Sequence, residues 1–108
     1  MRYEVRITTG AECDLVEITA FLAEREGLAV AEGVLQGLLD CAGDLARFPE
    51  RGSFPKELLK LGIREFRQAL CQPYRLVYRI AGNQVFVLLV ADGRRDFQSL
   101  LERRLLRD

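Results

Sequence analysis

The spacing of apolar residues changes halfway along the chain, and this change limits the folds available to it. Before a loop at Phe48–Pro55, apolar residues recur at steps of three and four, which is the period of an amphipathic helix. After the loop, short runs rich in valine, isoleucine, tyrosine and phenylalanine are typical of β-strands. The pattern predicts an α+β protein in which a helical half precedes a half that is mostly sheet.

The first half is predicted to contain one strand and two helices. Residues Tyr3–Thr8 alternate between apolar and polar side chains, as expected for a strand with one buried face. A helix is predicted over Ala11–Glu26, because Thr9 and Glu12 have the spacing of a capping box. A second helix is predicted over Ala29–Arg47. The short joint between the helices predicts an antiparallel hairpin.

The second half is predicted to contain three strands and a final helix. The strands are Ile63–Leu70, Tyr74–Ile80 and Val85–Ala91. Gly82 and Asn83 suit a tight turn between the second and third of them. The third is apolar on both faces, so it should lie centrally in the sheet. A basic amphipathic helix should follow, with Asp96 as its cap.

The length and composition indicate a single packed domain over residues 1–108. A chain of 108 residues with 49% hydrophobic and 30% charged residues can bury one core but is short for two. No apolar run approaches the roughly 20 residues that a membrane span needs. The N-terminus also lacks the pattern of a signal peptide. We therefore expect a cytoplasmic protein that does not contact a membrane.

The net charge of zero conceals an asymmetry between the two halves. Residues 1–50 carry four basic and ten acidic side chains, whereas residues 51–108 carry twelve basic and six acidic ones. An excess of arginine in one half is a candidate surface for an anionic partner, either nucleic acid or an acidic protein segment. Alternatively, the two halves pair with each other or face solvent.

Arginines in the second half are the candidate binding residues. Alternation along Tyr74–Ile80 places Arg75 and Arg79 on the face opposite the tyrosines, where either a carboxylate such as Glu65 pairs with them or the face forms a groove. Further arginines follow the central strand and continue along the last helix, ending at Arg107. The predicted target-binding residues are Arg75, Arg79, Arg94, Arg95, Arg103 and Arg104.

Histidine and cysteine usage restricts the chemistry. The chain has no histidine, so any catalysis would rely on arginine, lysine, tyrosine or a carboxylate. Cys13, Cys41 and Cys71 are odd in number and too widely spaced for a typical zinc or dithiol motif. We expect all three to be small buried hydrophobic residues. No metal or cofactor is implied.

Three stretches together resemble a known superfamily. They are residues 62–67 (GIREFR), 73–80 (PYRLVYRI) and 90–96 (VADGRRD), in that order after an acidic helical hairpin. This arrangement resembles the RelE/ParE toxins of type II toxin-antitoxin systems over nearly the whole chain. The resemblance implies an N-terminal strand and a helical hairpin packed on a mostly antiparallel sheet of three or four strands, with a basic C-terminal helix.

The superfamily has two activities on one fold. RelE-like members cleave messenger RNA in the ribosomal A site, and the resemblance would assign Arg75 and Arg95 to phosphate and transition-state binding. Such nucleases also use lysines on the preceding strand and a tyrosine near the C-terminus. Here residues 63–67 contain no lysine and no tyrosine follows Tyr78. Since arginine transfers protons poorly, the resemblance favours the ParE-like branch, whose members inhibit DNA gyrase by binding it.

The resemblance also implies partners. A cognate antitoxin would neutralise the toxin by laying a helical segment over its apolar and basic surface, and an acidic segment would suit it electrostatically. A toxin-antitoxin hetero-oligomer is then expected, with gyrase as the target and no catalytic residue or cofactor in the toxin. Two alternatives stay open: a ribosome-dependent endoribonuclease that binds the ribosome with messenger RNA, and a non-toxic protein-interaction module.

Overall fold

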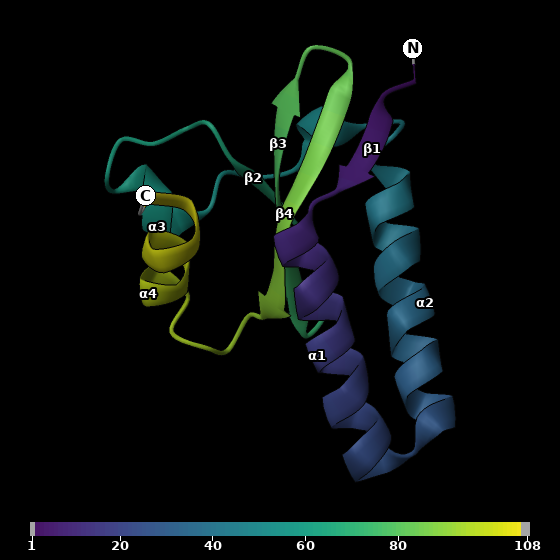
Figure 1. The fold of residues 1–108 in the computed structure, drawn as a ribbon. Coiled ribbons are helices and arrows are strands. Elements are labelled where there is room, and N and C mark those ends of the chain that lie inside the picture. Colours follow the sequence, from purple (N-terminus) through teal and green to yellow (C-terminus); the bar gives the residue numbers. More distant parts are fainter. Residues whose placement is uncertain (1, 107–108) are drawn as a thin grey trace.

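The computed structural model describes residues 2–106 and contains a four-stranded mixed sheet with the strand order β1-β4-β3-β2. The strands are β1 (Glu4–Ile7), β2 (Arg67–Cys71), β3 (Tyr74–Ala81) and β4 (Gln84–Asp92). β1 runs parallel to β4, and the other two pairs are antiparallel (Figure 1). The prediction of an α+β fold with a mostly antiparallel sheet is confirmed.

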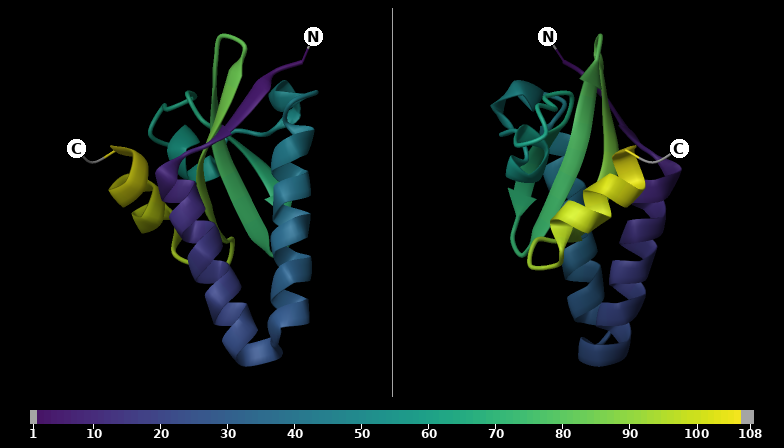
Figure 2. Two further views of the ribbon diagram at one scale, coloured as in Figure 1. Left: turned by 45° about the vertical axis from the view of Figure 1, so that its right-hand side comes forward. Right: turned by 90° about the vertical axis from the view of Figure 1, so that its left-hand side faces the viewer.

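Helices cover both faces of this sheet. They are α1 (Thr9–Glu26), α2 (Leu28–Asp44), the 3-10 turn η1 (Pro49–Arg51), α3 (Lys56–Leu59), α4 (Phe97–Leu101) and the π-helical turn η2 (Glu102–Leu106). The α1–α2 hairpin lies on one side of the sheet, and α3 and α4 lie on the other (Figures 1 and 2). No helix within residues 2–106 combines the length and apolar character needed to cross a membrane.

The helical hairpin differs from its prediction at both ends. Thr8, and not Thr9, is the N-cap, because its side chain accepts the N–H of Ala11 at 3.4 Å. The predicted capping box is therefore wrong. The second helix ends at Asp44, three residues before Arg47, because residues 45–47 donate to carbonyls three positions back and form a turn. This turn carries Leu45 into the core.

A β-bulge in β4 lets this central strand contribute buried side chains to both faces of the sheet. Val77 pairs with Leu89, and the next residue of β3, Tyr78, pairs with Val87, so Leu88 has no partner across the strands. The extra residue reverses the alternation of β4. Val85, Val87 and Val90 therefore face the hairpin, whereas Leu89 and Ala91 face α3 and α4. The prediction that this strand is central and apolar on both faces is confirmed.

Two clusters of buried side chains form the core on either side of the sheet. On the hairpin side, Tyr78 is fully buried and its hydroxyl donates to the carbonyl of Pro49, which satisfies the polar end of the ring. On the other side, Leu58, Phe97 and Leu101 pack against the sheet. The second cluster therefore fixes the position of the C-terminal helix.

The strand predicted over Ile63–Leu70 forms over Arg67–Cys71. Residues 63–66 are irregular and follow Gly62, whose φ of +78° begins a change of chain direction. Glu65 consequently lies outside the sheet and is exposed. The turn predicted between β3 and β4 is confirmed, with a φ of +62° at Gly82 and Ala81 opposite Gln84.

Candidate target-binding site

Arg75 lies inside the protein and does not form part of a basic surface. Arg75 is 9% exposed, and its Nη1 and Nη2 atoms donate to the two carboxylate oxygens of Glu57 at 2.9 and 2.8 Å. Its Nε atom donates to Gln68 at 2.8 Å. The predicted pairing of Glu65 with Arg75 or Arg79 is wrong, since Glu57 takes that place for Arg75 and Glu65 forms no ion pair within residues 2–106.

The surroundings of Arg75 are shaped to hold it. Its guanidinium carbon lies 3.8 Å from the centre of the Phe97 ring, at the start of α4. Gly93 makes room for the side chain, because a Cβ atom there would lie 2.9 Å from Arg75 Cδ. The hydrogen bond from Arg75 is the main reason that the pKa of Glu57 is lowered from 4.5. This group is a neutralised structural ion pair beneath α4.

Arg94 is exposed but is held by its neighbour Asp92 at the end of β4. Its Nε donates to Asp92 Oδ1 at 2.9 Å and its Nη2 to Oδ2 at 2.5 Å. These hydrogen bonds lower the pKa of Asp92 to about 2, so the carboxylate is charged at neutral pH. Arg94 presents a partly balanced charge to solvent.

Arg95 is exposed at the rim of a cavity of about 380 Å³ between α1 and the end of the sheet. Tyr74, Phe21 and Ile18 supply apolar lining, and Glu17 supplies a carboxylate. Burial is the main cause that raises the pKa of Tyr74 from 10.0, so its hydroxyl remains protonated at neutral pH. The cavity thus combines an arginine with apolar and acidic groups.

Arg103 is exposed, whereas Arg104 is anchored to the sheet and to α1. Arg104 donates to the two carboxylate oxygens of Asp14 at 2.8 and 3.1 Å, and to the carbonyl of Leu88 at 3.1 Å. Leu88 is the bulged residue of β4, so Arg104 satisfies a carbonyl at the irregular part of the strand. Arg107, which was predicted to extend this charge, lies outside the described residues.

Arg79 is exposed near the other end of β4, where it pairs with Phe86. Asp92 lies six positions after Phe86, which corresponds to about 20 Å along a strand. A shallow cavity of about 390 Å³ lies there, lined by Glu50, Arg64, Glu65, Arg67, Arg79 and Ile80. Arg79 is therefore separated from Arg94 and Arg95.

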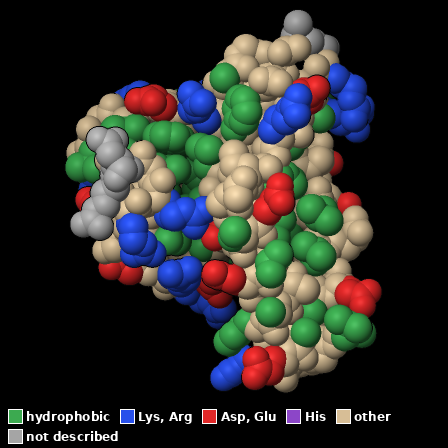
Figure 3. All heavy atoms as spheres, viewed as in Figure 1, with side chains coloured by type: hydrophobic (Ala, Val, Ile, Leu, Met, Phe, Trp, Pro, Cys, Tyr) green, Lys and Arg blue, Asp and Glu red, His purple; other side chains and the backbone are tan. Residues whose placement is uncertain are grey.

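The six predicted residues thus occupy three settings. Arg75 is buried, Arg79 lies near the β3–β4 turn, and the remaining four lie around the end of β4 and the C-terminal helix. Figure 3 shows basic side chains gathered beside this helix, with acidic ones among them. We call the exposed residues Arg94, Arg95 and Arg103 the C-terminal basic surface.

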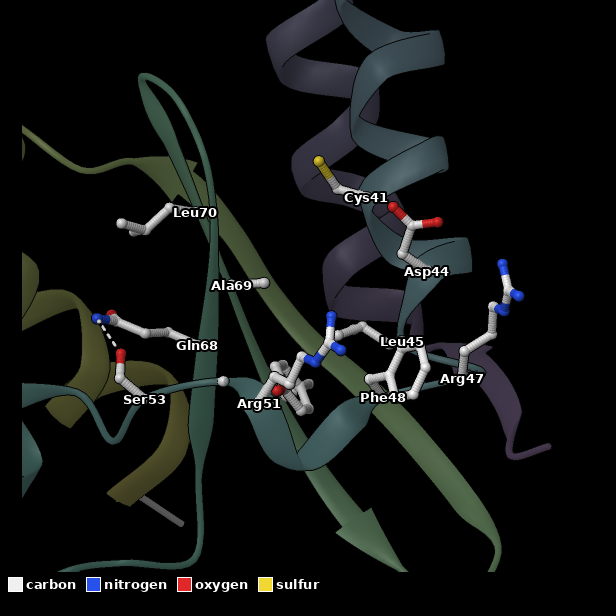
Figure 4. A pocket seen from close by; sticks show the side chains of 12 residues that line it. Cys41, Asp44, Leu45, Arg47, Phe48, Arg51, Ser53, Gln68, Ala69 and Leu70 are labelled. Carbon is white, nitrogen blue, oxygen red and sulfur yellow. Dashed lines mark hydrogen bonds between the residues drawn. The ribbon is translucent and has the colours of Figure 1, made fainter. Parts of the chain in front are cut away.

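A larger cavity of about 550 Å³ lies between α2 and β2, and none of the six residues lines it (Figure 4). Cys41 points into this space, and burial is the main cause that raises the pKa of its thiol to about 12. A thiol with this pKa is protonated at neutral pH and is a poor nucleophile. Cys71 is half-buried, as Cys41 is, but Cys13 is exposed, which contradicts the expectation that all three are buried.

Sequence reasoning missed the two carboxylates that neutralise predicted site residues. Glu57 is 18 positions from Arg75, and Asp14 is 90 positions from Arg104. Neither separation along the sequence corresponds to a helical or cross-strand spacing, so no local pattern indicates these pairs. An excess of acidic residues in α1 was visible, but it does not identify Asp14.

Comparisons with known proteins agree with this architecture. The family model described as the ParE toxin of the type II toxin-antitoxin system, parDE, matches residues 5–97. Toxin ParE3 of Caulobacter vibrioides is 28% identical over 91 residues, covering 84% of this chain and 87% of that protein.

Two solved structures are also similar. A chain of the chromosomal ParDE system from P. aeruginosa has a TM-score of 0.72 and 16% identity, covering 84% of this chain and 96% of the other. A chain of the RelBE2 toxin-antitoxin complex from Mycobacterium tuberculosis has a TM-score of 0.62 and 29% identity, covering 85% and 99%. Because the family model spans most of the fold, this chain belongs to the ParE toxin family of type II toxin-antitoxin systems.

Proposed function

We propose that this ParE-family toxin inhibits DNA gyrase by binding it through the C-terminal basic surface, and that it has no catalytic residue of its own. Arg94, Arg95 and Arg103 are exposed and available for an acidic partner. Arg79 would take part only if the interface extended along β4. Arg75 and Arg104 would act indirectly, by holding the C-terminal helix that carries Arg103.

The state of Arg75 is the observation that carries this proposal. If this chain were a RelE-like nuclease, Arg75 would have to stabilise charge on the RNA substrate. Here its charge is balanced by Glu57 and covered by Phe97, at 3.8 Å from the ring centre. A guanidinium in this setting cannot reach a phosphate unless the C-terminal helix moves.

The proton-transfer groups of the chain also favour binding over cleavage. Burial is the main cause that raises the pKa of both Tyr74 and Tyr78, so neither tyrosine serves readily as a base at neutral pH. The third tyrosine, Tyr3, lies near η1, far from the C-terminal basic surface along the sheet. The sequence has no histidine. A toxin with these groups is better suited to occupy a protein target than to hydrolyse RNA.

An antitoxin partner is part of the same proposal. The solved structures that resemble this chain come from a ParDE system and from a RelBE2 toxin-antitoxin complex. We propose that a cognate antitoxin binds this toxin in a hetero-oligomer and blocks its action on gyrase.

The cellular test is induction of the toxin in a bacterial host without antitoxin, with DNA and protein synthesis followed separately by pulse labelling. We expect DNA synthesis to fall first, with filamentous cells and an SOS response. Early loss of translation with codon-positioned messenger cleavage would contradict the proposal and support a ribonuclease. Normal growth with folded toxin present would support the interaction module.

A further inference from the structure

Two cysteines that are far apart in the sequence lie close together where α2 packs on β2. Cys41 is near the end of α2, and Cys71 is the last residue of β2, about 30 positions later in the sequence. Both are half-buried, and both pack against the core cluster on the hairpin side of the sheet. Their spacing gives no sign of this arrangement, because it forms only when the hairpin folds onto the sheet.

The two side chains meet at the same turn of α2. The thiol of Cys71 donates to the carbonyl of Gly37 at 3.6 Å. Gly37 lies one turn before Cys41, and within an α-helix its carbonyl is directed toward the N–H of Cys41. Helical side chains lean toward the N-terminus of their helix, so the side chain of Cys41 leans over the turn that contains Gly37. The two sulfur atoms are therefore neighbours.

The position of Cys41 on α2 also directs it to the sheet. Leu38 and Leu45, which share its face of the helix, are 2% and 6% exposed and belong to the core on the hairpin side. Figure 4 shows Cys41 and Ala69 pointing into the space between α2 and β2 from opposite sides. Cys71 follows Ala69 by two positions, so it shares this face of β2.

The ionisation of Cys41 reflects the same surroundings. Burial is the main cause that raises the pKa of its thiol to about 12, a hydrogen bond with the Cys71 thiol is the next, and Asp44 and Asp40 contribute. A thiol with this pKa attacks slowly at neutral pH, and as a thiolate it also leaves slowly. A disulfide that contains Cys41 is therefore slow to form and slow to be reduced.

Oxidation suits this pair of thiols better than metal binding does. Among residues 2–106, no group of three or more cysteine, aspartate or glutamate side chains could hold a metal ion. Cys71 is also accessible to a small reagent, because it adjoins Gln72 and Pro73, which are exposed in the turn between β2 and β3. Cys71 can therefore react first with an oxidant from solvent.

We propose that Cys41 and Cys71 form a reversible disulfide that joins the helical hairpin to the edge strand β2 under oxidising conditions. The oxidant is a small disulfide such as oxidised glutathione. The Cys71 thiolate attacks one sulfur of the oxidant, whose S–S bond breaks and releases one thiol. Cys41 then loses its proton and attacks the Cys71 sulfur of the mixed disulfide, which releases the second thiol. The two cysteines together lose two protons and two electrons, and the oxidant becomes two thiols.

This disulfide stabilises the toxin without any partner, so the inference does not rest on gyrase binding. It closes a loop of about 30 residues and thereby lowers the entropy of the unfolded chain. We expect the melting temperature to rise on the order of 10 °C. Proteolysis should slow at least about tenfold, because proteases cleave opened chains. The oxidised toxin therefore persists longer than the reduced one.

The test uses the full chain with Cys13→Ser, which removes the exposed third thiol and leaves the pair intact. The reduced protein is incubated with oxidised glutathione, and thiol titration and intact mass follow the products. We expect both thiols to be lost, with a mass lower by about 2 Da and no retained glutathione. Peptide mapping should join Cys41 to Cys71. Persistence of both thiols, or a glutathione adduct that does not close, would overturn the proposal.

A matched variant separates closure from simple oxidation. Cys41→Ala in the same Cys13→Ser chain leaves Cys71 as the single thiol. We expect this variant to retain one glutathione on Cys71 and to gain no thermal stability, and melts of the reduced proteins check that both chains fold. Equal melting temperatures of the oxidised and reduced Cys13→Ser chain would contradict the stabilising role. All of these readouts use the toxin alone, so failure of the gyrase assay would leave them unchanged.

Discussion

Arg75 illustrates how the role of one residue depends on its counter-ion. A buried guanidinium is costly unless its hydrogen bonds are satisfied and its charge is balanced. Glu57 provides both with two hydrogen bonds, and Gln68 and Phe97 complete the surroundings. The alternation of side chains along β3 correctly predicted that Arg75 and Tyr78 lie on opposite faces of this strand. The residue that pairs with Arg75 could not be predicted in the same way, because Glu57 lies on α3 and not on a strand next to β3.

Glu57→Gln should destabilise the protein strongly, because it leaves the buried charge of Arg75 without a counter-ion. Removing one partner of such a pair costs about 3–5 kcal/mol. Glu65→Gln is the matched control, since Glu65 is exposed and should change stability by less than about 0.5 kcal/mol. Urea denaturation measures both values. Similar values for the two variants would contradict the role given to Glu57.

The same ion pair should make stability depend on pH in the acid range. Because the pKa of Glu57 is lowered from 4.5 in the folded protein, its stabilising effect is fully present above pH 4.5 and is lost as pH falls through the lower folded value. Unfolding free energies measured from neutral to acid pH should therefore fall more steeply below 4.5 for the unaltered protein than for Glu57→Gln. Parallel curves would show that this carboxylate is not coupled to folding.

At the scale of elements, the end of η1 approaches β2 so closely at Gly52 that there is no room for a side chain. A Cβ atom on Gly52 would overlap the hydroxyl of buried Tyr78 and would lie 2.8 Å from the carbonyl oxygen of Gln68. Gly52→Ala should therefore cost several kcal/mol, on the order of 2–4. Gly43→Ala in α2 meets nothing within 4 Å and should stabilise by about 0.5–1 kcal/mol. Thermal melts distinguish these opposite signs, and equal shifts would contradict the packing.

The C-terminal helix is held at its far end by Arg104. Arg104→Met keeps much of the side-chain volume but removes the ion pair with Asp14, whose side chain is 13% exposed, and the bond to Leu88. We expect faster hydrogen exchange over residues 97–106 and a loss of about 1–3 kcal/mol. Arg103→Met, at an exposed neighbouring position, should leave exchange unchanged. Equal exchange in both variants would mean that Arg104 does not anchor the helix.

Elements with a regular pattern could be predicted, and irregular ones could not. Both helices of the hairpin and the turn at Gly82 follow directly from spacing and turn chemistry. The bulge at Leu88 has no signal, because every residue from Val85 to Val90 is apolar and any register would look the same. The late start of β2 was missed because Phe66 suits a strand but packs in the cluster of α3 and α4 instead.

At the scale of the whole molecule, the charge difference between the halves of the sequence becomes a difference between surfaces. The acidic residues are concentrated on the α1–α2 hairpin, and much of the arginine lies on the sheet and the C-terminal helix (Figure 3). Internal pairs such as Arg75 with Glu57 remove part of the basic charge. Near the C-terminal helix, Arg94, Arg95 and Arg103 are exposed, so the candidate basic surface is smaller than the six arginines expected from the sequence.

The most direct test of the account is a supercoiling assay with purified gyrase and three charge-reversal variants. Arg95→Glu and Arg103→Glu alter the C-terminal basic surface, and Arg6→Glu is the control on β1, opposite Phe86 at the other end of β4. We predict that the unaltered toxin inhibits supercoiling, that Arg95→Glu and Arg103→Glu each require about tenfold more protein, and that Arg6→Glu resembles the unaltered toxin. Unchanged supercoiling with folded, unaltered toxin would contradict the account.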